Sequence, residues 1–240
     1  MTVEEFLQQP NVKEYLSQDD LASVYYCDPP EGFTMWLMNH GINPFDYFTD
    51  SIPDYCFRDT AHHGNIQHVF LDGKSVGRYC FVNSHIKSVT GSPIDIGKGA
   101  FQNCTVDNME LHLAPHLYVG NEAFSYSTIK RGFIESEQSV VTNGQFLHCT
   151  LDGRLTFNSK ILHLQFDSLR QMTVKELEIK ADRITASGTA SYKGCNIEVL
   201  VLPNFTCADL SVHEDLKILA RYAKQVICHD GEYESDIKYV

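Results

Sequence analysis

The feature of this sequence that most constrains its fold is a short motif that returns every 20 to 24 residues. Each copy opens with an apolar residue and closes, five residues later, with a phenylalanine. The closing residues are Phe57, Phe81, Phe101, Phe124 and Phe146. A unit of this length cannot bury its own apolar residues, whereas stacked neighbouring units bury a continuous core. The sequence therefore predicts a solenoid in which each copy forms one coil.

The residues after each phenylalanine also repeat. The third residue on is small and the fifth is apolar. In the four clearest units these positions hold Ser84, Cys104, Ser127 and Cys149, then Ile86, Val106, Ile129 and Leu151. Apolar residues then alternate over a short run, and a period of two indicates a strand. Each unit is thus predicted to contain a helical or 3₁₀ turn that ends at phenylalanine, a tight corner and a short strand.

The pattern continues less regularly towards the C-terminus. A sixth unit is expected to start at Phe166, with its strand at 174–179. In a seventh unit Tyr192 takes the place of phenylalanine and the strand covers 197–203, and a degenerate eighth unit is expected at 216–219. The predicted organisation is an N-terminal cap at 1–50, a solenoid of about seven to eight units at 51–220 and a C-terminal cap or tail at 221–240.

One unit reads Ile-Gly-Lys-Gly-Ala-Phe-Gln-Asn-Cys over 96–104. This resembles the repeat of the BspA-like leucine-rich-repeat family, roughly Ile-Gly-x-x-Ala-Phe-x-x-Cys followed by an apolar strand. The resemblance is strongest over 76–157 and departs at Thr142, Gln145 and Phe166. It implies an α/β leucine-rich-repeat solenoid with a parallel β-sheet, and a role in adhesion or protein recognition. A right-handed parallel β-helix is the alternative fold, and it would need three strands in each coil.

The first 50 residues carry no repeat. An amphipathic run over 31–40 contains Phe33 and Trp36 and is ended by Gly41, which predicts a helix. The end coils of a solenoid expose apolar core and unpaired strand edges, so they need caps. We expect a short α-helical N-terminal cap, and the alternative is that this segment is itself a binding module.

The charge balance restricts the class of partner. The chain has 19 basic and 31 acidic residues and a formal net charge of −12. Binding to nucleic acid needs a basic surface that neutralises phosphates, so this balance disfavours nucleic acid and, by the same reasoning, an anionic membrane. It is compatible with a basic protein partner, and also with solubility alone.

The positions of the cysteines and the first residues of the chain indicate the cellular compartment of the protein. Five of the eight cysteines fall on core positions of the repeat frame, where other units have alanine or serine: Cys56, Cys80, Cys104, Cys149 and Cys195. Such alternation does not require disulfides, so we expect reduced thiols. The first residues lack the basic start and apolar centre of a signal peptide, and no run of 18 apolar residues occurs. The expected localisation is cytoplasmic.

A search for chemistry finds no catalytic or phosphate-binding motif. His62, His63 and His68 cluster near Cys56, but no second half-site with metal-ligand spacing follows. Surface loop histidines are the preferred interpretation, with a metal site as the alternative. We therefore expect no catalytic, cofactor-binding or metal-binding residues, and a chain that is not an enzyme.

Strand residues between the buried positions point outwards, and stacked strands align them into ladders about 5 Å apart. The central ladder holds Phe70, Thr90, Glu110, Phe133, Thr156, Glu178 and Val201. The flanking ladder holds His68, Ser88, Asn108, Arg131, Arg154, Glu176 and Val199. Aromatic and arginine side chains are the ones that anchor interfaces. The predicted partner-binding residues are Phe70, Glu110, Arg131, Phe133, Arg154, Thr156 and Glu178.

These ladders favour a non-catalytic protein–protein interaction module, such as an inhibitor, adaptor or regulator, that binds through the strand face of the solenoid. The alternative function is a structural component of a larger assembly, such as a surface or virion-associated protein. For Phe70, coverage by a loop or by the N-terminal cap is an alternative to partner binding.

Overall fold

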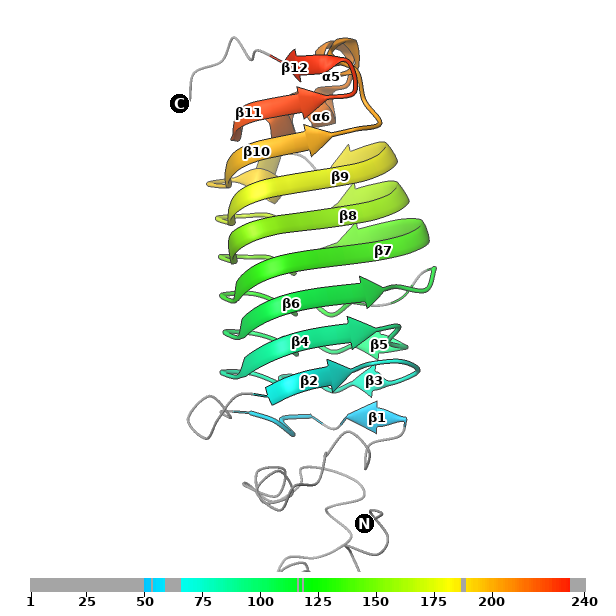
Figure 1. Ribbon diagram of the computed structural model, residues 1–240, viewed down its shortest axis with the longest axis vertical. Coiled ribbons are helices and arrows are strands. Elements are labelled where there is room, and N and C mark those ends of the chain that lie inside the picture. Colours follow the sequence, from blue (N-terminus) through cyan, green and yellow to red (C-terminus); the bar gives the residue numbers. More distant parts are fainter. Residues whose placement is uncertain are drawn as a thin grey trace, which may run out of the picture.

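A computed structural model describes residues 50–52, 54–58, 66–115, 117, 119–186 and 189–233. They form a solenoid whose coils stack along the long axis of the molecule (Figure 1). The helical cap predicted at 1–50 lies, except for Asp50, outside the described residues. No helix within the described part of the chain is long and apolar enough to cross a membrane.

One face of the solenoid is a nine-stranded sheet with the order β12-β11-β10-β9-β8-β7-β6-β4-β2. Its strands are β2 (Ile66–Phe70), β4 (His85–Gly91), β6 (Thr105–His112), β7 (Thr128–Thr142), β8 (Thr150–Leu164), β9 (Thr173–Ala186), β10 (Asn196–Leu202), β11 (Ala223–Cys228) and β12 (Gly231–Tyr233). All neighbours pair in parallel except the last, where β12 is antiparallel to β11. The predicted parallel sheet is confirmed.

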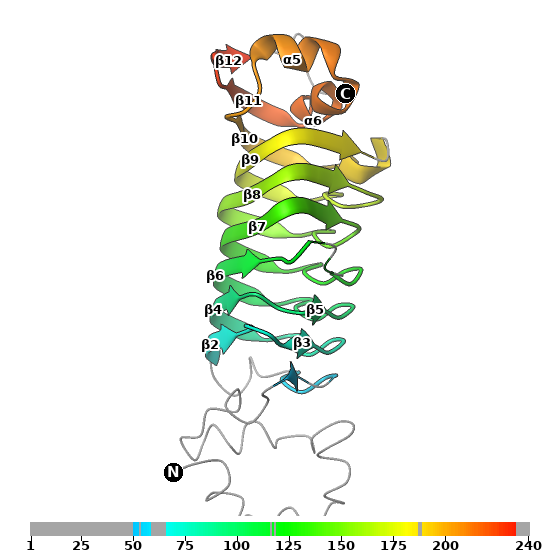
Figure 2. The same cartoon turned by 90° about the vertical axis from the view of Figure 1, so that its right-hand side faces the viewer.

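More residues of the coils lie in β-strands than the sequence predicts. A second parallel sheet is formed by β1 (Ser51–Ile52), β3 (Ser75–Val76) and β5 (Asp95–Ile96). In the middle coils β7, β8 and β9 are 14 to 15 residues long and curve round to the second side (Figure 2). Up to β9 the described coils therefore have a strand or a bridge residue on two sides, whereas α5 and α6 follow β10. The predicted repeat has strand on one side, and the β-helix alternative has it on three.

The helical turn predicted before each phenylalanine is wrong for most coils. The described helices are η3 (Thr189–Tyr192), α5 (Cys207–Val212) and α6 (Glu214–Ala220), all towards the C-terminus. The earlier coils have hydrogen-bonded turns at this place. Tyr79 and Asn83, on either side of Phe81, have φ of 53° and 58°. Residues with left-handed backbone four positions apart prevent an α-helix from continuing.

The repeat phenylalanines form one buried stack, as predicted. Ring centroids of consecutive members lie 5.0 Å (Phe57–Phe81), 4.9 Å (Phe81–Phe101), 5.4 Å (Phe101–Phe124) and 5.3 Å (Phe124–Phe146) apart, with interplanar angles of no more than 14°. All five side chains are fully buried. This aromatic column is the core that the coils share.

The sixth coil departs from the predicted frame. Leu169, not Phe166, occupies the phenylalanine position: Leu169 is buried, whereas Phe166 is 63% exposed. The left-handed residues Asp167 and Gln171 flank Leu169 in the same way that pairs of left-handed residues flank Phe81, Phe101, Phe124 and Phe146. Tyr192 takes this position in the seventh coil and is fully buried, as expected.

The small residue after each phenylalanine joins neighbouring coils. In four coils its side chain donates a hydrogen bond to the carbonyl of the preceding coil's phenylalanine: Ser84 to Phe57 O (2.7 Å), Cys104 to Phe81 O (2.7 Å), Ser127 to Phe101 O (2.6 Å) and Cys149 to Phe124 O (3.3 Å). Burial raises the pKa of the Cys104 and Cys149 thiols to about 12, so both remain protonated donors at neutral pH. Serine and cysteine alternate here because either can make this bond.

This equivalence predicts that Cys149→Ser costs about 1 kcal/mol or less of unfolding free energy, because the hydroxyl keeps the bond to the Phe124 carbonyl. Cys149→Ala, which removes the donor, should cost more. Chemical denaturation of both variants measures the difference. A larger loss for serine than for alanine would contradict the proposed role of this position.

The described cysteines Cys56, Cys80, Cys104, Cys149, Cys195, Cys207 and Cys228 carry no disulfide. We expect alkylation of freshly purified protein under denaturing, non-reducing conditions to label all eight cysteines of the chain. Mass spectrometry of the labelled protein gives the number directly. Recovery of an intramolecular disulfide would overturn the expectation of reduced thiols.

The C-terminal end is closed by helices and a short strand (Figure 1). The eighth unit predicted at 216–219 is helix α6, and the strand of that coil is β11, beyond the predicted end of the solenoid. Thr206 and Asp209 form a capping box at the start of α5. The three-residue β12 covers part of the last parallel strand, which limits the exposed sheet edge.

Candidate partner-binding surface

The strand register in the structure pairs the residues of the central ladder as predicted. Phe70 pairs with Thr90, Thr90 with Glu110, and Glu110 with Phe133. Phe133 then pairs with Thr156, Thr156 with Glu178, and Glu178 with Val201. These residues therefore form one continuous row across seven strands of the sheet, from β2 to β10.

A β-bulge in β8 shifts the register between β7 and β8 next to the flanking ladder. The pairs Ile129–Leu151 and Gly132–Leu155 give β8 one more residue than β7 over this stretch. Gly153 lies in the bulge, where a Cβ would come 2.2 Å from Lys130 O, so a larger residue is excluded. Because the extra residue comes before Arg154, the predicted side-by-side placement of Arg131 and Arg154 is retained.

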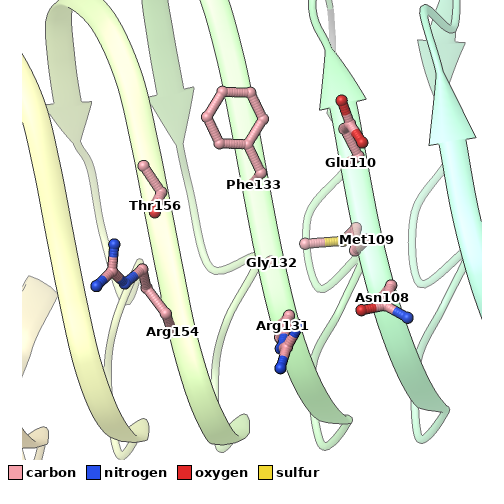
Figure 3. Close-up of a pocket in the computed structure, with 8 residues that line it drawn as sticks. All are labelled: Asn108, Met109, Glu110, Arg131, Gly132, Phe133, Arg154 and Thr156. Carbon is pink, nitrogen blue, oxygen red and sulfur yellow. The ribbon is translucent and has the colours of Figure 1, made fainter.

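A hollow of about 360 Å³ lies on the outer face of β6, β7 and β8 (Figure 3). It is lined by Asn108, Met109, Glu110, Arg131, Gly132, Phe133, Arg154 and Thr156. The Gly132 backbone belongs to its floor, and Leu155 and Met109 fill the space below, since a Cβ on Gly132 would lie 2.7 Å from Leu155 Cδ1. Five of the predicted partner-binding residues meet here, namely Glu110, Arg131, Phe133, Arg154 and Thr156.

The two arginines of the hollow differ in their surroundings. Arg154 is held by Glu176 (Nη2–Oε1 2.6 Å) and by Glu178 (Nη1–Oε2 3.4 Å). Arg131 is exposed, and no described residue makes a hydrogen bond or ion pair with its guanidinium. Its five donors are therefore available to a partner, whereas those of Arg154 are partly used within the protein.

Glu178 and Thr156 are more buried than expected. Their exposed fractions are 8% and 4%, so both side chains are buried on the strand face, and their contact with a partner stays a prediction. The Glu178 carboxylate accepts from Thr156 Oγ1 (3.0 Å) and lies 3.4 Å from both Arg154 Nη1 and Lys180 Nζ. The long side chains of these cations shield it from solvent. Thr156 and Glu178 thus position Arg154 and offer little contact area themselves.

Phe133 is flanked by an acidic and imidazole cluster that the sequence analysis missed. His112 Nδ1 lies 3.0 Å from Glu135 Oε2, and its Nε2 lies 3.3 Å from Glu110 Oε1. The His112 ring meets Phe133 edge to face, with centroids 6.1 Å apart. The sequence does contain the spacing that predicts this cluster. His112 follows Glu110 by two residues in the same strand, so both side chains point to the same face of the sheet. The half-buried Phe133 ring therefore has arginines on one side and carboxylates on the other.

Phe70 is not part of the hollow. It is 51% exposed at the N-terminal end of the sheet, and its ring stacks on His68 with centroids 6.0 Å apart. His68 also contacts Ser88 Oγ through Nδ1 (2.9 Å). His62 and His63, considered with His68 as a histidine cluster, lie outside the described residues.

Stacked parallel strands, a shared phenylalanine column and a turn with left-handed residues in successive coils define a repeat protein of the β-solenoid type. The family model for the BspA type leucine rich repeat region, in six copies, matches residues 45–152 and 74–198. These ranges span more than half of the chain, so the chain belongs to the BspA-type leucine-rich-repeat family. Repeat domains of this kind are typically protein-binding and generally non-catalytic. No curated protein and no solved structure is significantly similar to the chain.

Proposed function

We propose that this chain is a protein-interaction module that binds its partner through the hollow around Phe133 and Arg131. The observation that carries the proposal is an exposed guanidinium, without a partner among the described residues, beside a half-exposed phenylalanine in a concave site of about 360 Å³. Aromatic and arginine side chains in such pockets contribute most of the binding energy at protein interfaces. The curved sheet of a solenoid supplies the extended surface around them.

The charges suggest two properties of the partner. The net charge of −12 favours a partner that is basic overall, because complementary fields steer encounter. In the hollow, the Arg131 guanidinium can only donate hydrogen bonds. The partner group that binds there is therefore a hydrogen-bond acceptor, either a carboxylate or a backbone carbonyl. The cytoplasm is the compartment in which we expect the two proteins to meet.

The experiment is an affinity capture from a lysate of the source organism with three baits. They are the wild-type chain, the Arg131→Ala/Phe133→Ala variant and the Phe166→Ala variant. Phe166 is a matched control because it is an exposed phenylalanine on a turn outside the hollow. We expect one stoichiometric protein on the wild-type and Phe166→Ala baits and its loss from the double variant.

Retention of that protein by the double variant would move the binding surface elsewhere and contradict the proposal. Capture of further copies of the chain itself, in stoichiometric amount and independently of these residues, would instead favour the alternative of a structural component that assembles with itself.

A further inference from the structure

Two cysteines and a carboxylate meet at the C-terminal end of the solenoid. Cys207 is the first residue of α5, Cys228 is the last residue of β11, and Asp230 lies in the turn between β11 and β12. Their sulfur and oxygen atoms all lie within 4.8 Å of one another. Among the described residues this is the one group of three or more histidine, cysteine or acidic side chains placed so closely.

Backbone contacts hold the three donors in place. Cys207 N donates to Asp230 Oδ1 (2.8 Å), and His229 N donates to Phe205 O (2.8 Å). The capping box fixes the residue before Cys207, since Thr206 N donates to Asp209 Oδ2 (2.7 Å). The main-chain amides of Cys207 and His229 thus fix the backbone around the triangle, and the Cys207 thiol is in addition within hydrogen-bonding reach of Asp230 and Cys228.

These two cysteines differ from those of the repeat frame. Cys104 and Cys149 are enclosed between coils and donate to a phenylalanine carbonyl. Cys228 is buried, at 6% exposed, but Cys207 is only half-buried and Asp230 is exposed, so a solute can reach the triangle from the side of these two residues. Cys228 lies in register with Leu202 of β10 and belongs to the core, whereas Cys207 and Asp230 stand outside the repeat frame. The packing of the coils therefore explains the place of Cys228, but not the approach of Cys207 and Asp230 to it.

We propose that Cys207, Cys228 and Asp230 bind a thiophilic divalent cation of the Zn²⁺ type, with water in the fourth position of a tetrahedron. Two thiolates select zinc over magnesium or calcium, which prefer oxygen ligands. Binding displaces the two thiol protons to solvent. The bound cation links the start of α5 to the end of β11 and so stabilises the packing of the C-terminal helices against the last coil.

The test uses the full chain, reduced and freed of metal by a chelator, and titrated with Cd²⁺ as a spectroscopic probe for Zn²⁺. We expect a thiolate-to-cadmium charge-transfer absorption that saturates at one equivalent and is displaced by Zn²⁺. We also expect Tm to rise with Zn²⁺ concentration, as it does for any ligand that binds only the folded state.

The variant Cys207→Ser/Cys228→Ser should lose both signals, while Cys149→Ser, a cysteine of the repeat core, should keep both. Asp230→Asn leaves both thiols and the fold intact, and should weaken Zn²⁺ binding by at least about tenfold because a neutral amide replaces an anionic ligand. It therefore tests the site even if the double variant fails to fold.

Three results would overturn the proposal: no absorption with the wild-type chain, an unchanged signal in Asp230→Asn together with a retained signal in the double variant, or a Cys207–Cys228 disulfide in freshly purified protein. The disulfide would make the pair a redox couple and not a cation site. None of these results bears on the hollow around Phe133, which lies several coils away.

Discussion

Phe101→Ala is expected to lower the free energy of unfolding by roughly 3–5 kcal/mol, the usual cost of removing a buried aromatic ring. Phe101 lies in the middle of the column, between Phe81 at 4.9 Å and Phe124 at 5.4 Å, and is fully buried. Its loss leaves a cavity that the stacked backbone cannot close, because hydrogen bonds between coils fix their spacing. Urea denaturation followed by circular dichroism measures the change.

Phe166→Ala serves as the control for that measurement. It removes the same ring from a position that is 63% exposed, so the change in unfolding free energy should stay within about 0.5 kcal/mol. A loss below about 1 kcal/mol for Phe101→Ala would mean that the phenylalanine column does not carry the core.

Arg131→Ala together with Phe133→Ala is expected to weaken partner binding by at least about 2 kcal/mol, which is roughly 30-fold in Kd. The Tm should hardly change, because Arg131 has no described internal partner and Phe133 lies on the outer face. Isothermal calorimetry with the captured partner, alongside a melting curve, measures both quantities. A large fall in Tm with the affinity preserved would show that Phe133 supports the fold and not the interface.

Arg154 is unsuitable for this test. Its truncation would remove ion pairs with Glu176 and Glu178 and leave the buried Glu178 carboxylate with Lys180 as its remaining cationic neighbour. Loss of one partner of a buried charge destabilises a protein strongly, so an effect on affinity could not be separated from an effect on stability.

The repeat made much of this fold predictable from the sequence. A constant spacing sets the phenylalanine column, and the period of two along each strand sets the ladder, so the row from Phe70 to Val201 could be aligned without coordinates. The same alignment places Phe133 close to Arg131 and Arg154, although it does not reveal that the surface between them is hollow. What repeats in the sequence could thus be placed in space.

The features that break the repeat could not be placed in this way. Phe166 suggested the sixth coil by its aromatic ring, but the left-handed residues Asp167 and Gln171 set the frame around Leu169. The burial of Glu178 depends on cations from two strands, which alternation alone does not reveal. Cys207 and Cys228 meet because α5 folds back beside the end of β11, a contact with no counterpart in the repeat.

Site-specific photo-cross-linking tests the central claim most directly. A benzoylphenylalanine placed at position 133 keeps an aromatic ring in the hollow, and one at position 166 provides a control on the exposed turn. Irradiation in lysate should join position 133, and not position 166, to a single protein that is the one captured by the wild-type chain. Cross-links from position 166 to that protein, with none from position 133, would show that the chain binds its partner through a different surface.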